Sequence, residues 1–368
     1  MKNRLSVIVA GGGTGGHIFP AIAIANAIRQ LHPETDILFV GAKGKMEMEK
    51  VPQAGYPIKG LTIAGFNRSS LIKNIGLPLK LVQSFLQVAE IFKRNQPDAV
   101  IGVGGYSSFP VLRYAQWKGI PTFIHEANSF GGKSNILLSK KATAVFTATD
   151  GMETFFPANK ILVTGNPVRQ NITQSGIDKE EACRFFGLNA AKKTVFCMGG
   201  SLGAKSINEA LNRHLHLLIQ QDVQLIWQTG KLFTAQVQAE VQHLHGVYVS
   251  EFITQMDMAY AAADVVVSRS GAMALAELCV VQKPAILVPY PFAAEDHQTA
   301  NAMNLVQKNA AILVKDQDAM EQLIPAILNL IQDEQKQEIL RREIAKLAIT
   351  DADKIVAKAI LKEILKSD

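Results

Sequence analysis

Cysteine is scarce in this chain, and the three cysteines that it has, Cys183, Cys197 and Cys279, show no CxxC spacing. An odd and widely spaced set argues against a disulfide framework and a structural zinc site, and it favours a reducing compartment. No run approaches the roughly 18 uncharged apolar residues that a membrane span needs. The first apolar run, Leu5–Ala10, is shorter than the core of a signal peptide, and glycines follow it at once. We therefore expect a soluble cytoplasmic protein.

Charged residues are also few, at 19%, whereas apolar residues make up 48% of the 368 residues. This composition excludes disorder, collagen and coiled coil as the main content, and the length predicts two or three domains. The net charge of +6 is uneven, because residues 1–164 hold 18 Lys and Arg against 9 Asp and Glu, and residues 165–368 hold 20 against 23. A basic first half favours a partner that only this half meets, either nucleic acid or an anionic membrane surface.

Short β-branched runs alternate with helical periodicity, which is typical of βαβ units on a parallel sheet. The predicted strands cover residues 5–10, 37–40, 99–103, 122–125, 144–147, 194–198, 225–228, 247–249, 264–268 and 285–288. Helices are predicted over 20–30, 205–219 and about 353–365. Each half begins with a strand, a glycine-rich loop and a helix, so we predict an α/β protein with two Rossmann-like domains, residues 1–165 and 166–349. The C-terminal helix, within about 350–368, has one apolar face, and its spacing leaves open which domain it covers.

Three glycine-rich loops follow predicted strands, at residues 11–17, 102–106 and 199–203. Glycines let a ligand approach the backbone, and N–H groups at a helix start favour an anion. The first loop satisfies GxGxxG, yet the acid that holds an NAD ribose belongs at the far end of the second strand, whereas Asp36 opens that strand. The third loop lacks the GK[ST] ending of a P-loop. Loops at strand ends in both halves point to one crevice between the domains, and an NAD site or merely tight turns are the alternatives.

Polar side chains accompany these loops. His17 is a candidate general base near neutral pH, or else a capping residue. The segment 268–277 is a strand end that runs into a helix start, where backbone amides favour a pyrophosphate without a metal. Glu277, farther along that helix, would accept hydrogen bonds from a ribose diol or merely stabilise the helix. His125, with Glu126 and Asn128 beside it, forms either a second polar cluster or an ordinary loop.

The spacing of the potential metal ligands gives only weak evidence for a metal site. The HxH pair at 214–216 lies on a predicted helix, where the two rings face nearly opposite ways, and the pair at 243–245 lacks a third ligand. The DxD pairs at 316–318 and 351–353 resemble the metal-binding motif of some sugar transferases. Each precedes a predicted helix, however, where acids commonly act as caps.

Residues 65–94 account for much of the basic character of the first half. Five cations stand against the single acid Glu90, and leucine and other apolar residues are interleaved with them. This pattern suits an anionic bilayer surface. Nucleic acid would favour stacking aromatics, of which the stretch has only three phenylalanines. The alternative is a helix that packs its apolar face inward and leaves its lysines in solvent.

Seven motifs occur in order: GGGTGGHIFPA, GVGGYSS, HEAN, GNPVR, GGSLGA, RSGAMALAE and PFAAEDHQTANA. Together, over about residues 5–310, they resemble the family of undecaprenyldiphospho-muramoylpentapeptide N-acetylglucosaminyltransferases. The resemblance implies a GT-B fold, in which a cleft separates two Rossmann-like domains. It implies inverting transfer of GlcNAc from UDP-GlcNAc to the C4 hydroxyl of the muramoyl sugar of lipid I, which yields lipid II and UDP in peptidoglycan synthesis.

The resemblance also implies partners and a location. The partners would be UDP-GlcNAc, lipid I, an anionic membrane surface and other cell-wall synthesis proteins, without nucleic acid. No cofactor would be required, and no divalent metal would be essential. The protein would lie on the cytoplasmic side of the bacterial inner membrane as a peripheral enzyme.

Residue roles follow from the same resemblance. The donor-side residues would be Thr14, Gly15, Gly16, Asn128, Arg169, Ser201, Ile253, Ala272, Met273, Ala274, Leu275, Ala276, Glu277 and Gln298. Some members have two adjacent glutamines where this chain has Gln298-Thr299, so the position that reads the sugar hydroxyls stays open. The acceptor-side residues would be His17, Tyr106, His125 and Glu126. The membrane-docking patch would comprise Lys73, Ile75, Leu79, Trp117 and Lys141.

Inverting transfer needs one base for the acceptor proton and stabilisation of the departing diphosphate. We prefer His17 as the base, with Glu126 as the competing candidate. Two other functions remain open. The first is another GT-B enzyme acting on UDP-GlcNAc, either an epimerase or a transferase with a different acceptor. The second is a non-catalytic, membrane-recruited module that binds a UDP-sugar.

Overall fold

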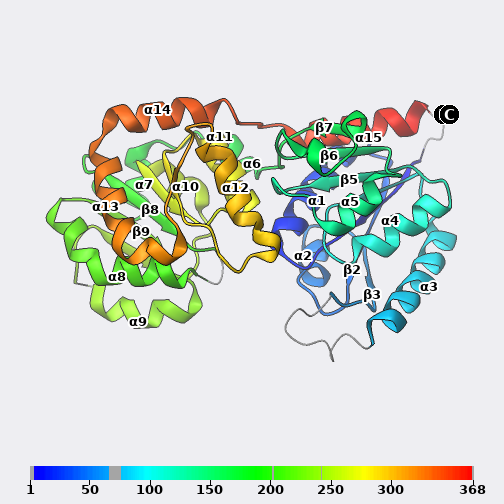
Figure 1. Ribbon diagram of the computed structural model, residues 1–368, viewed down its shortest axis with the longest axis horizontal. Helices are drawn as coiled ribbons and strands as arrows, with labels where there is room; N and C mark the ends of the chain where they lie inside the picture. Colours follow the sequence, from blue (N-terminus) through cyan, green and yellow to red (C-terminus); the bar gives the residue numbers. More distant parts are fainter. Residues whose placement is uncertain (1–3, 66–75, 201–202, 242, 367–368) are drawn as a thin grey trace. The chain divides into compact units, whose positions relative to one another are not determined.

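The computed structural model describes residues 4–65, 76–200, 203–241 and 243–366, and it forms two units (Figure 1). The first unit comprises the chain up to Val168 together with the C-terminal residues from Asp351 onward. The second unit is Arg169–Thr350. Each unit is built on its own parallel β-sheet with helices on both faces, which is the Rossmann-like architecture that the alternating sequence pattern predicts.

Over its described residues, the first unit holds a seven-stranded sheet in the order β3-β2-β1-β4-β5-β6-β7. The strands are β1 (Ser6–Ala10), β2 (Asp36–Ala42), β3 (Ile58–Leu61), β4 (Ala99–Gly102), β5 (Thr122–Glu126), β6 (Ala144–Thr147) and β7 (Ile161–Val163). The helices are α1 (Gly15–Leu31), α2 (Glu47–Gln53), α3 (Leu77–Asn95), α4 (Ser108–Trp117), α5 (Lys133–Ser139) and α15 (Ala352–Lys366), with short turns η2 (Met152–Thr154) and η3 (Ala158–Lys160). The strand order reverses between β1 and β4, so the loops after these two strands flank the position where such sheets bind ligands.

The second unit repeats this plan. The part of it that the structure describes has a six-stranded sheet in the order β10-β9-β8-β11-β12-β13. The strands are β8 (Thr194–Met198), β9 (Gln224–Gln228), β10 (Val247–Ser250), β11 (Val265–Ser268), β12 (Ala285–Leu287) and β13 (Ile312–Leu313). The helices are α6 (Gln170–Thr173), α7 (Lys179–Phe185), α8 (Lys205–Gln220), α9 (Lys231–Val241), α10 (Met256–Ala262), α11 (Ala272–Val281), α12 (His297–Val306), α13 (Ala319–Gln332) and α14 (Glu334–Ala345), with short turns η4 (Ala294–Asp296) and η5 (Asp316–Asp318). Here the order reverses between β8 and β11, where the third glycine loop and the start of α11 follow.

The helix after the first glycine loop begins earlier than the sequence predicts, at Gly15 rather than near residue 20. Thr14 is extended, with φ −142° and ψ 158°, and its carbonyl accepts hydrogen bonds from the N–H groups of His17 and Ile18. The prediction failed because glycines at 15 and 16 disfavour a helix interior. The first turn of α1 tolerates them, and this places His17 in that turn.

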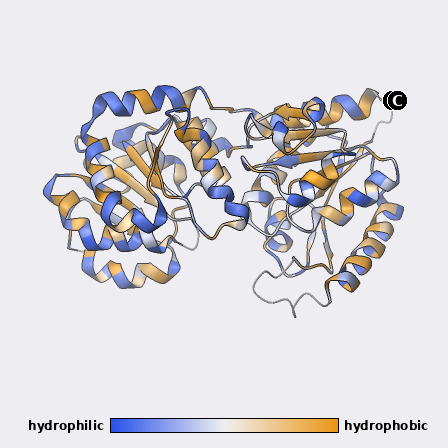
Figure 2. Ribbon diagram, in the orientation of Figure 1, coloured by the Kyte–Doolittle hydropathy of each residue, from blue (hydrophilic) through white to orange (hydrophobic). Residues whose placement is uncertain are grey.

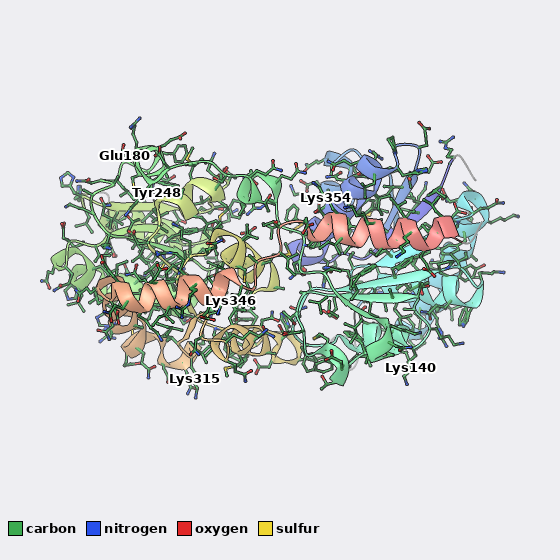
Figure 3. The ribbon with its side chains drawn as sticks, turned by 90° about the horizontal axis from the view of Figure 1, so that it is seen from above. Lys140, Glu180, Tyr248, Lys315, Lys346 and Lys354 are labelled. Atoms are coloured by element: carbon green, nitrogen blue, oxygen red, sulfur yellow. The ribbon has the colours of Figure 1, made fainter. Side chains whose placement is uncertain are left out.

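The C-terminal helix α15 packs in the first unit. Its buried residues Ile360 and Ile364 belong to the same apolar core as Ile24 and Ile28 of α1. Lys354, labelled near the start of this helix in Figure 3, lies on its exposed side. The one apolar face that the sequence predicts for this helix therefore covers the sheet of the first unit.

Truncation of this helix face tests the packing. Ile360 is fully buried, so Ile360→Ala should lower the free energy of unfolding by about 2–5 kcal/mol, measured by urea titration and circular dichroism. Ile339→Ala in α14 is the matched control, because Ile339 is 40% exposed and its loss should cost about 0.5 kcal/mol or less. Equal stability of the two variants would show that α15 does not hold this position in solution.

Candidate active site

Because α1 begins at Gly15, the first glycine loop is shorter than predicted and covers residues 11–14; it holds the ring of His17 at the carboxyl edge of β1. The His17 Nδ1 atom lies 3.1 Å from the carbonyl oxygen of Gly12 and 3.3 Å from Oγ1 of Thr14. A carbonyl only accepts hydrogen bonds, so the bond to Gly12 requires the proton on Nδ1. In the neutral ring the lone pair is then on Nε2, and this is the tautomer that a general base at Nε2 needs.

The loop after β4 packs directly against this arrangement. A Cβ atom on Gly104 would come within 2.8 Å of His17 Nε2, and one on Gly105 would come within 2.5 Å of the Gly12 carbonyl oxygen. Both positions have positive φ, so glycine meets a steric and a conformational requirement at once. Tyr106 follows, half-buried, and burial together with the charge of Glu47 raises the pKa of its hydroxyl.

Glu47 is a buried acid of the candidate site that the sequence analysis missed. Its side chain is 1% exposed, and its carboxylate accepts hydrogen bonds from the N–H of Gly13 at 2.8 Å and the N–H of Ala42 at 2.9 Å. It therefore joins the first glycine loop to the end of β2. No motif contains it, and its partners are backbone groups, so the only signal in the sequence is an acid shortly after the second strand.

His125, at the end of β5, is almost completely buried and lies in the same unit as His17. Its Nε2 donates to the carbonyl of Gly165 at 3.3 Å, and Nδ1 has no hydrogen-bond partner among the described residues. Burial lowers the pKa of this imidazole to about 4, so the ring is neutral near pH 7. His125 thus contributes a buried neutral ring rather than an exposed cation.

Glu126 anchors the loop that follows β5. One carboxylate oxygen accepts from the N–H and the side-chain amide of Asn128, at 3.2 and 3.3 Å. The other accepts from the N–H of Gly132 at 3.0 Å and the Asn135 amide at 2.9 Å. Four hydrogen bonds to one buried carboxylate fix the loop and orient Asn128, and proton uptake by Glu126 would disrupt them.

Glu277 is the centre of a polar cluster in the second unit. It lies in the second turn of α11, and its side chain is 9% exposed. One carboxylate oxygen accepts two bonds from Arg169, at 2.9 and 3.2 Å, and the other accepts from the Tyr260 hydroxyl at 3.0 Å. Burial, with Glu277 beside it, raises the pKa of Tyr260 well above its usual value, so Tyr260 stays a donor. The arrangement orients the carboxylate, and its remaining lone pairs suit a diol.

The first turn of α11 adds an anion-binding feature next to this cluster. Gly271 precedes the helix in an extended conformation, and Ala272, Met273 and Ala274 supply the first backbone N–H groups. Leu275 and Ala276 continue the turn toward Glu277. Ser270, which is fully buried, is held by a bond from its hydroxyl to the Gln298 carbonyl at 2.7 Å. Ser201, predicted for the facing loop, lies outside the described residues.

Gln228, at the end of β9, connects two other predicted elements. Its buried amide donates to the Gly200 carbonyl at 3.1 Å and accepts from the N–H of Ile253 at 2.9 Å. Ile253 is 3% exposed, so it offers little side-chain surface. The sequence analysis also missed Gln228, which joins the third glycine loop to the segment that contains Ile253.

The two candidates for reading the sugar hydroxyls differ in their contacts. The amide oxygen of Gln298 accepts a hydrogen bond from the N–H of Tyr290 at 3.0 Å. This bond fixes the side chain and leaves the NH₂ group as the end that donates to a ligand. The Thr299 hydroxyl donates to Asp296 at 2.7 Å. Gln298 therefore keeps two donor hydrogens for a ligand, whereas the hydroxyl proton of Thr299 is engaged.

Neither DxD pair forms a metal centre in the structure as described. Asp316 bonds Arg269 and the Ser206 hydroxyl, and Arg269 also donates to the carbonyls of Val288 and Pro289. Asp353 lies in the first turn of α15. No group of three or more His, Cys, Asp or Glu residues with metal-binding geometry occurs among the described residues.

The helix α3 carries an exposed apolar face, which Figure 2 shows as orange residues among the blue ones. Leu79 is 75% exposed and Leu86 69%, with Val82 between them on the same side, whereas Ser84 is buried. The inward-packed apolar face considered for this helix is therefore present only toward its end, at Val88 and Phe92.

Trp117 lies beside this helix face, 57% exposed, and its ring stacks on Phe85 at 5.0 Å. Arg113 lies over the same ring, 5.7 Å from its centre. Lys140, labelled in Figure 3, and Lys141 are exposed in the same unit. Lys73 and Ile75, also predicted for the patch, lie outside the described residues. No described helix has the length and the apolar composition to cross a bilayer.

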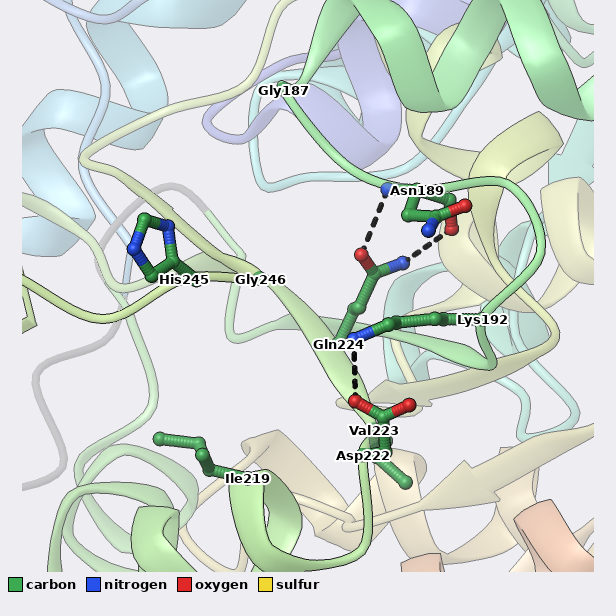
Figure 4. Close-up of a pocket in the computed structure, with 9 residues that line it drawn as sticks. All are labelled: Gly187, Asn189, Lys192, Ile219, Asp222, Val223, Gln224, His245 and Gly246. Carbon is green, nitrogen blue, oxygen red and sulfur yellow. Dashed lines mark hydrogen bonds and ion pairs between the residues drawn. The ribbon is translucent and has the colours of Figure 1, made fainter.

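A separate cavity of about 220 Å³ opens at the amino ends of β8, β9 and β10, on the edge opposite the glycine loops (Figure 4). Lys192 pairs with Asp222 there, and the amide of Gln224 is bonded on both sides by the backbone of Asn189. The polar side chains of Lys192, Asp222 and Gln224 are therefore already paired and do not converge on the cavity as unpaired groups.

The sequence matches two models of one family. Residues 7–147 match the glycosyltransferase family 28 N-terminal domain, and residues 194–356 match the glycosyltransferase family 28 C-terminal domain. A relative from Bacteroides fragilis is 51% identical over 98% of this chain and 96% of its own length. One from Phocaeicola vulgatus is 49% identical over 98% and 97%. Both are named UDP-N-acetylglucosamine–N-acetylmuramyl-(pentapeptide) pyrophosphoryl-undecaprenol N-acetylglucosamine transferase.

Solved structures agree with the sequence relatives. The crystal structure of MurG from Acinetobacter baumannii matches with a TM-score of 0.80 and 28% identity, over 97% of this chain and 99% of that one. A UDP-GlcNAc 2-epimerase from Neisseria meningitidis, bound to UDP-GlcNAc, matches with a TM-score of 0.62 at 16% identity, which shows a shared fold alone. The fold is thus that of the GT-B enzymes, as the sequence motifs predict. The chain belongs to the MurG family of N-acetylglucosamine transferases.

Proposed function

We propose that this chain transfers GlcNAc from UDP-GlcNAc to the C4 hydroxyl of the muramoyl sugar of lipid I, with inversion, and releases lipid II and UDP. The observation that carries this proposal is the identity of about 50%, over nearly the full length, to relatives named for this reaction. The geometry of each unit supplies chemistry that the reaction needs, and it lets individual residues be assigned to steps.

His17 is the base in this proposal. The acceptor oxygen forms a bond to C1 of GlcNAc while the bond from C1 to the diphosphate oxygen breaks, and the hydroxyl proton passes to Nε2 of His17. The support for this role is the bond from Nδ1 to the Gly12 carbonyl, which leaves the lone pair of the neutral ring on Nε2.

Glu126 serves instead as a positioning residue. Its carboxylate already accepts four hydrogen bonds from the loop. A proton on either oxygen would break some of these bonds. The same bonds orient Asn128 toward the transferred sugar. Tyr106 lies on the acceptor side, where its neutral phenol donates, and His125 contributes a buried neutral ring to the same side.

The donor binds the second unit. Glu277 accepts hydrogen bonds from the ribose hydroxyls, in an orientation that Arg169 and Tyr260 set. The first-turn amides of α11, Ala272 through Ala274, stabilise the leaving diphosphate with the positive end of the helix dipole. Gln298 donates to sugar hydroxyls through its amide. No divalent metal takes part in this account, since the amides supply the stabilisation.

The first unit docks on the cytoplasmic face of the membrane, where its lipid-linked acceptor resides. The support is the exposed stripe of Leu79, Val82 and Leu86 on α3, beside Trp117 and exposed lysines. Apolar side chains enter the boundary between headgroups and acyl chains, while cations meet anionic lipids.

Release of UDP tests the function directly. The purified chain with UDP-GlcNAc should release UDP only when a lipid I analogue is added, and the rate should persist in EDTA. Abolition by EDTA would contradict metal-free stabilisation of the diphosphate. Binding of UDP without acceptor-dependent release would contradict the transferase, and conversion of UDP-GlcNAc to its 2-epimer would identify the epimerase alternative.

Replacement of the proposed base should lower the rate by a defined factor. His17→Ala should lower kcat by about 10²–10⁴, the usual contribution of general base catalysis, with little change in the Kd of UDP measured by calorimetry. His216→Ala, an exposed histidine on α8, is the matched control and should keep full activity. A decrease of less than about tenfold for His17→Ala would exclude it as the base.

The membrane stripe is tested with vesicles of anionic phospholipid. Each exposed leucine contributes up to about 1.5–3 kcal/mol when buried, so Leu79→Glu with Leu86→Glu should lower the fraction that sediments with vesicles at least tenfold. Leu232→Glu on α9 with Ile339→Glu on α14 adds the same two charges at exposed apolar positions of the second unit and should bind as the parent does. Unchanged sedimentation of the double variant would contradict docking through α3.

A further inference from the structure

The carboxylate of Glu47 closes the gap where the backbone ladder between β1 and β2 ends. The last backbone bond beyond β1 runs from the N–H of Gly11 to the carbonyl of Val40, at 3.1 Å. Past it, the two carboxylate oxygens of Glu47 accept from Gly13 and Ala42, one on each side. A single side chain thus takes the place of the next rung and holds the glycine loop to the sheet.

Two glycines leave the space that this side chain occupies. A Cβ on Gly12 would lie 2.3 Å from Glu47 Cδ, and one on Gly41 would lie 2.4 Å from Glu47 Cγ. No side chain fits at either position while Glu47 keeps its place. Gly12 of the loop and Gly41 of β2 therefore make room for an internal carboxylate.

Glu47 and His17 are both hydrogen-bonded to the same peptide group. The carbonyl of Gly12, which accepts from His17 Nδ1, belongs to the same peptide group as the N–H of Gly13, which donates to Glu47. Because a peptide group is planar and rigid, a fixed N–H fixes the direction of its carbonyl. On the other side of Gly12, its own N–H donates a longer hydrogen bond, of 3.4 Å, to the carbonyl of Gly104.

The second contact of His17 Nδ1 does not specify a tautomer. The Thr14 hydroxyl, 3.3 Å away, donates as readily as it accepts, so it is compatible with a proton on either ring nitrogen. The Gly12 carbonyl accepts only. Of these two contacts, the one to the Gly12 carbonyl is therefore the one that favours a proton on Nδ1.

We propose that Glu47 is a positioning residue for the transfer: through the Gly12–Gly13 peptide it selects the His17 tautomer that carries the proton on Nδ1 and the lone pair on Nε2. The consequence for catalysis depends on the proposed function, in which Nε2 takes the acceptor proton. The selection of the tautomer does not depend on it and occurs without substrate.

The test combines ¹⁵N NMR of the histidine rings with kinetics. His17 is assigned by comparison with His17→Ala, and the parent should show a protonated Nδ1 and an unprotonated Nε2 in the neutral ring. Glu47→Gln keeps the size but offers an NH₂ group to one backbone N–H. In this variant the His17 signals should become an average of both tautomers, and kcat should fall by about 10- to 10²-fold with the KM for UDP-GlcNAc within about twofold.

Two further variants separate positioning from stability. Gly41→Ala keeps the carboxylate but displaces it, and should give the same NMR and kinetic pattern, so it replaces Glu47→Gln if that variant does not fold. Glu49→Gln, an exposed acid of the same helix paired with Lys50, should leave both readouts unchanged.

A single retained tautomer in folded Glu47→Gln or Gly41→Ala would overturn the proposal, whatever the activity. A fall in kcat without a change of tautomer would overturn it too, since it would show that Glu47 acts only on the stability of the loop. If the parent shows no acceptor-dependent UDP release, the proposed function fails, and the NMR comparison still decides the role of Glu47.

Discussion

At the carboxyl edge of a parallel sheet the chain leaves each strand and enters a loop, so backbone N–H and C=O groups there lack a partner on the neighbouring strand. Where these groups are buried, polar side chains form hydrogen bonds with them. Three examples among the described residues lie beside the candidate site. Glu47 holds the loop after β1, Glu126 the loop after β5, and Gln228 the loop after β8. The glycine loops depend on these anchors, since glycine itself restricts the backbone least.

Glu277 differs from these anchors in the kind of partner that it has. Side chains alone, Arg169 and Tyr260, account for the hydrogen bonds described above for its carboxylate. Backbone N–H groups account for both bonds described for Glu47 and for two of the four bonds to Glu126. A carboxylate held by backbone groups fixes the chain, and its loss would disturb the loop. One that is oriented by side chains near a helix start presents its remaining lone pairs to whatever enters. Similar buried acids thus serve two purposes, and the nature of their partners distinguishes them.

The sequence predicts the two sheets well because central strands are buried on both faces and are nearly continuous in apolar residues; β6 and β8 have the predicted bounds. The edge strands β3, β7 and β13 were not predicted, since they are short and partly exposed. Motifs predicted His17 and Glu277 as site residues. They did not reveal Glu47 or Gln228, because a contact to a backbone N–H leaves no pattern of side-chain types.

The exposed stripe on α3 follows from how that helix is held. Phe92 packs edge-on against Tyr114, and Phe85 stacks on Trp117, so aromatic pairs with α4 fix the rotation of the helix about its axis. With that rotation, Ser84 points inward and bonds the carbonyl of Leu81 in its own helix, while Leu79 and Leu86 face outward. A helix that only had to cover its sheet would bury the leucines and expose the serine. Their exposure is costly in water and less so where another apolar phase receives them, which is the physical reason for proposing that this stripe docks on a bilayer surface.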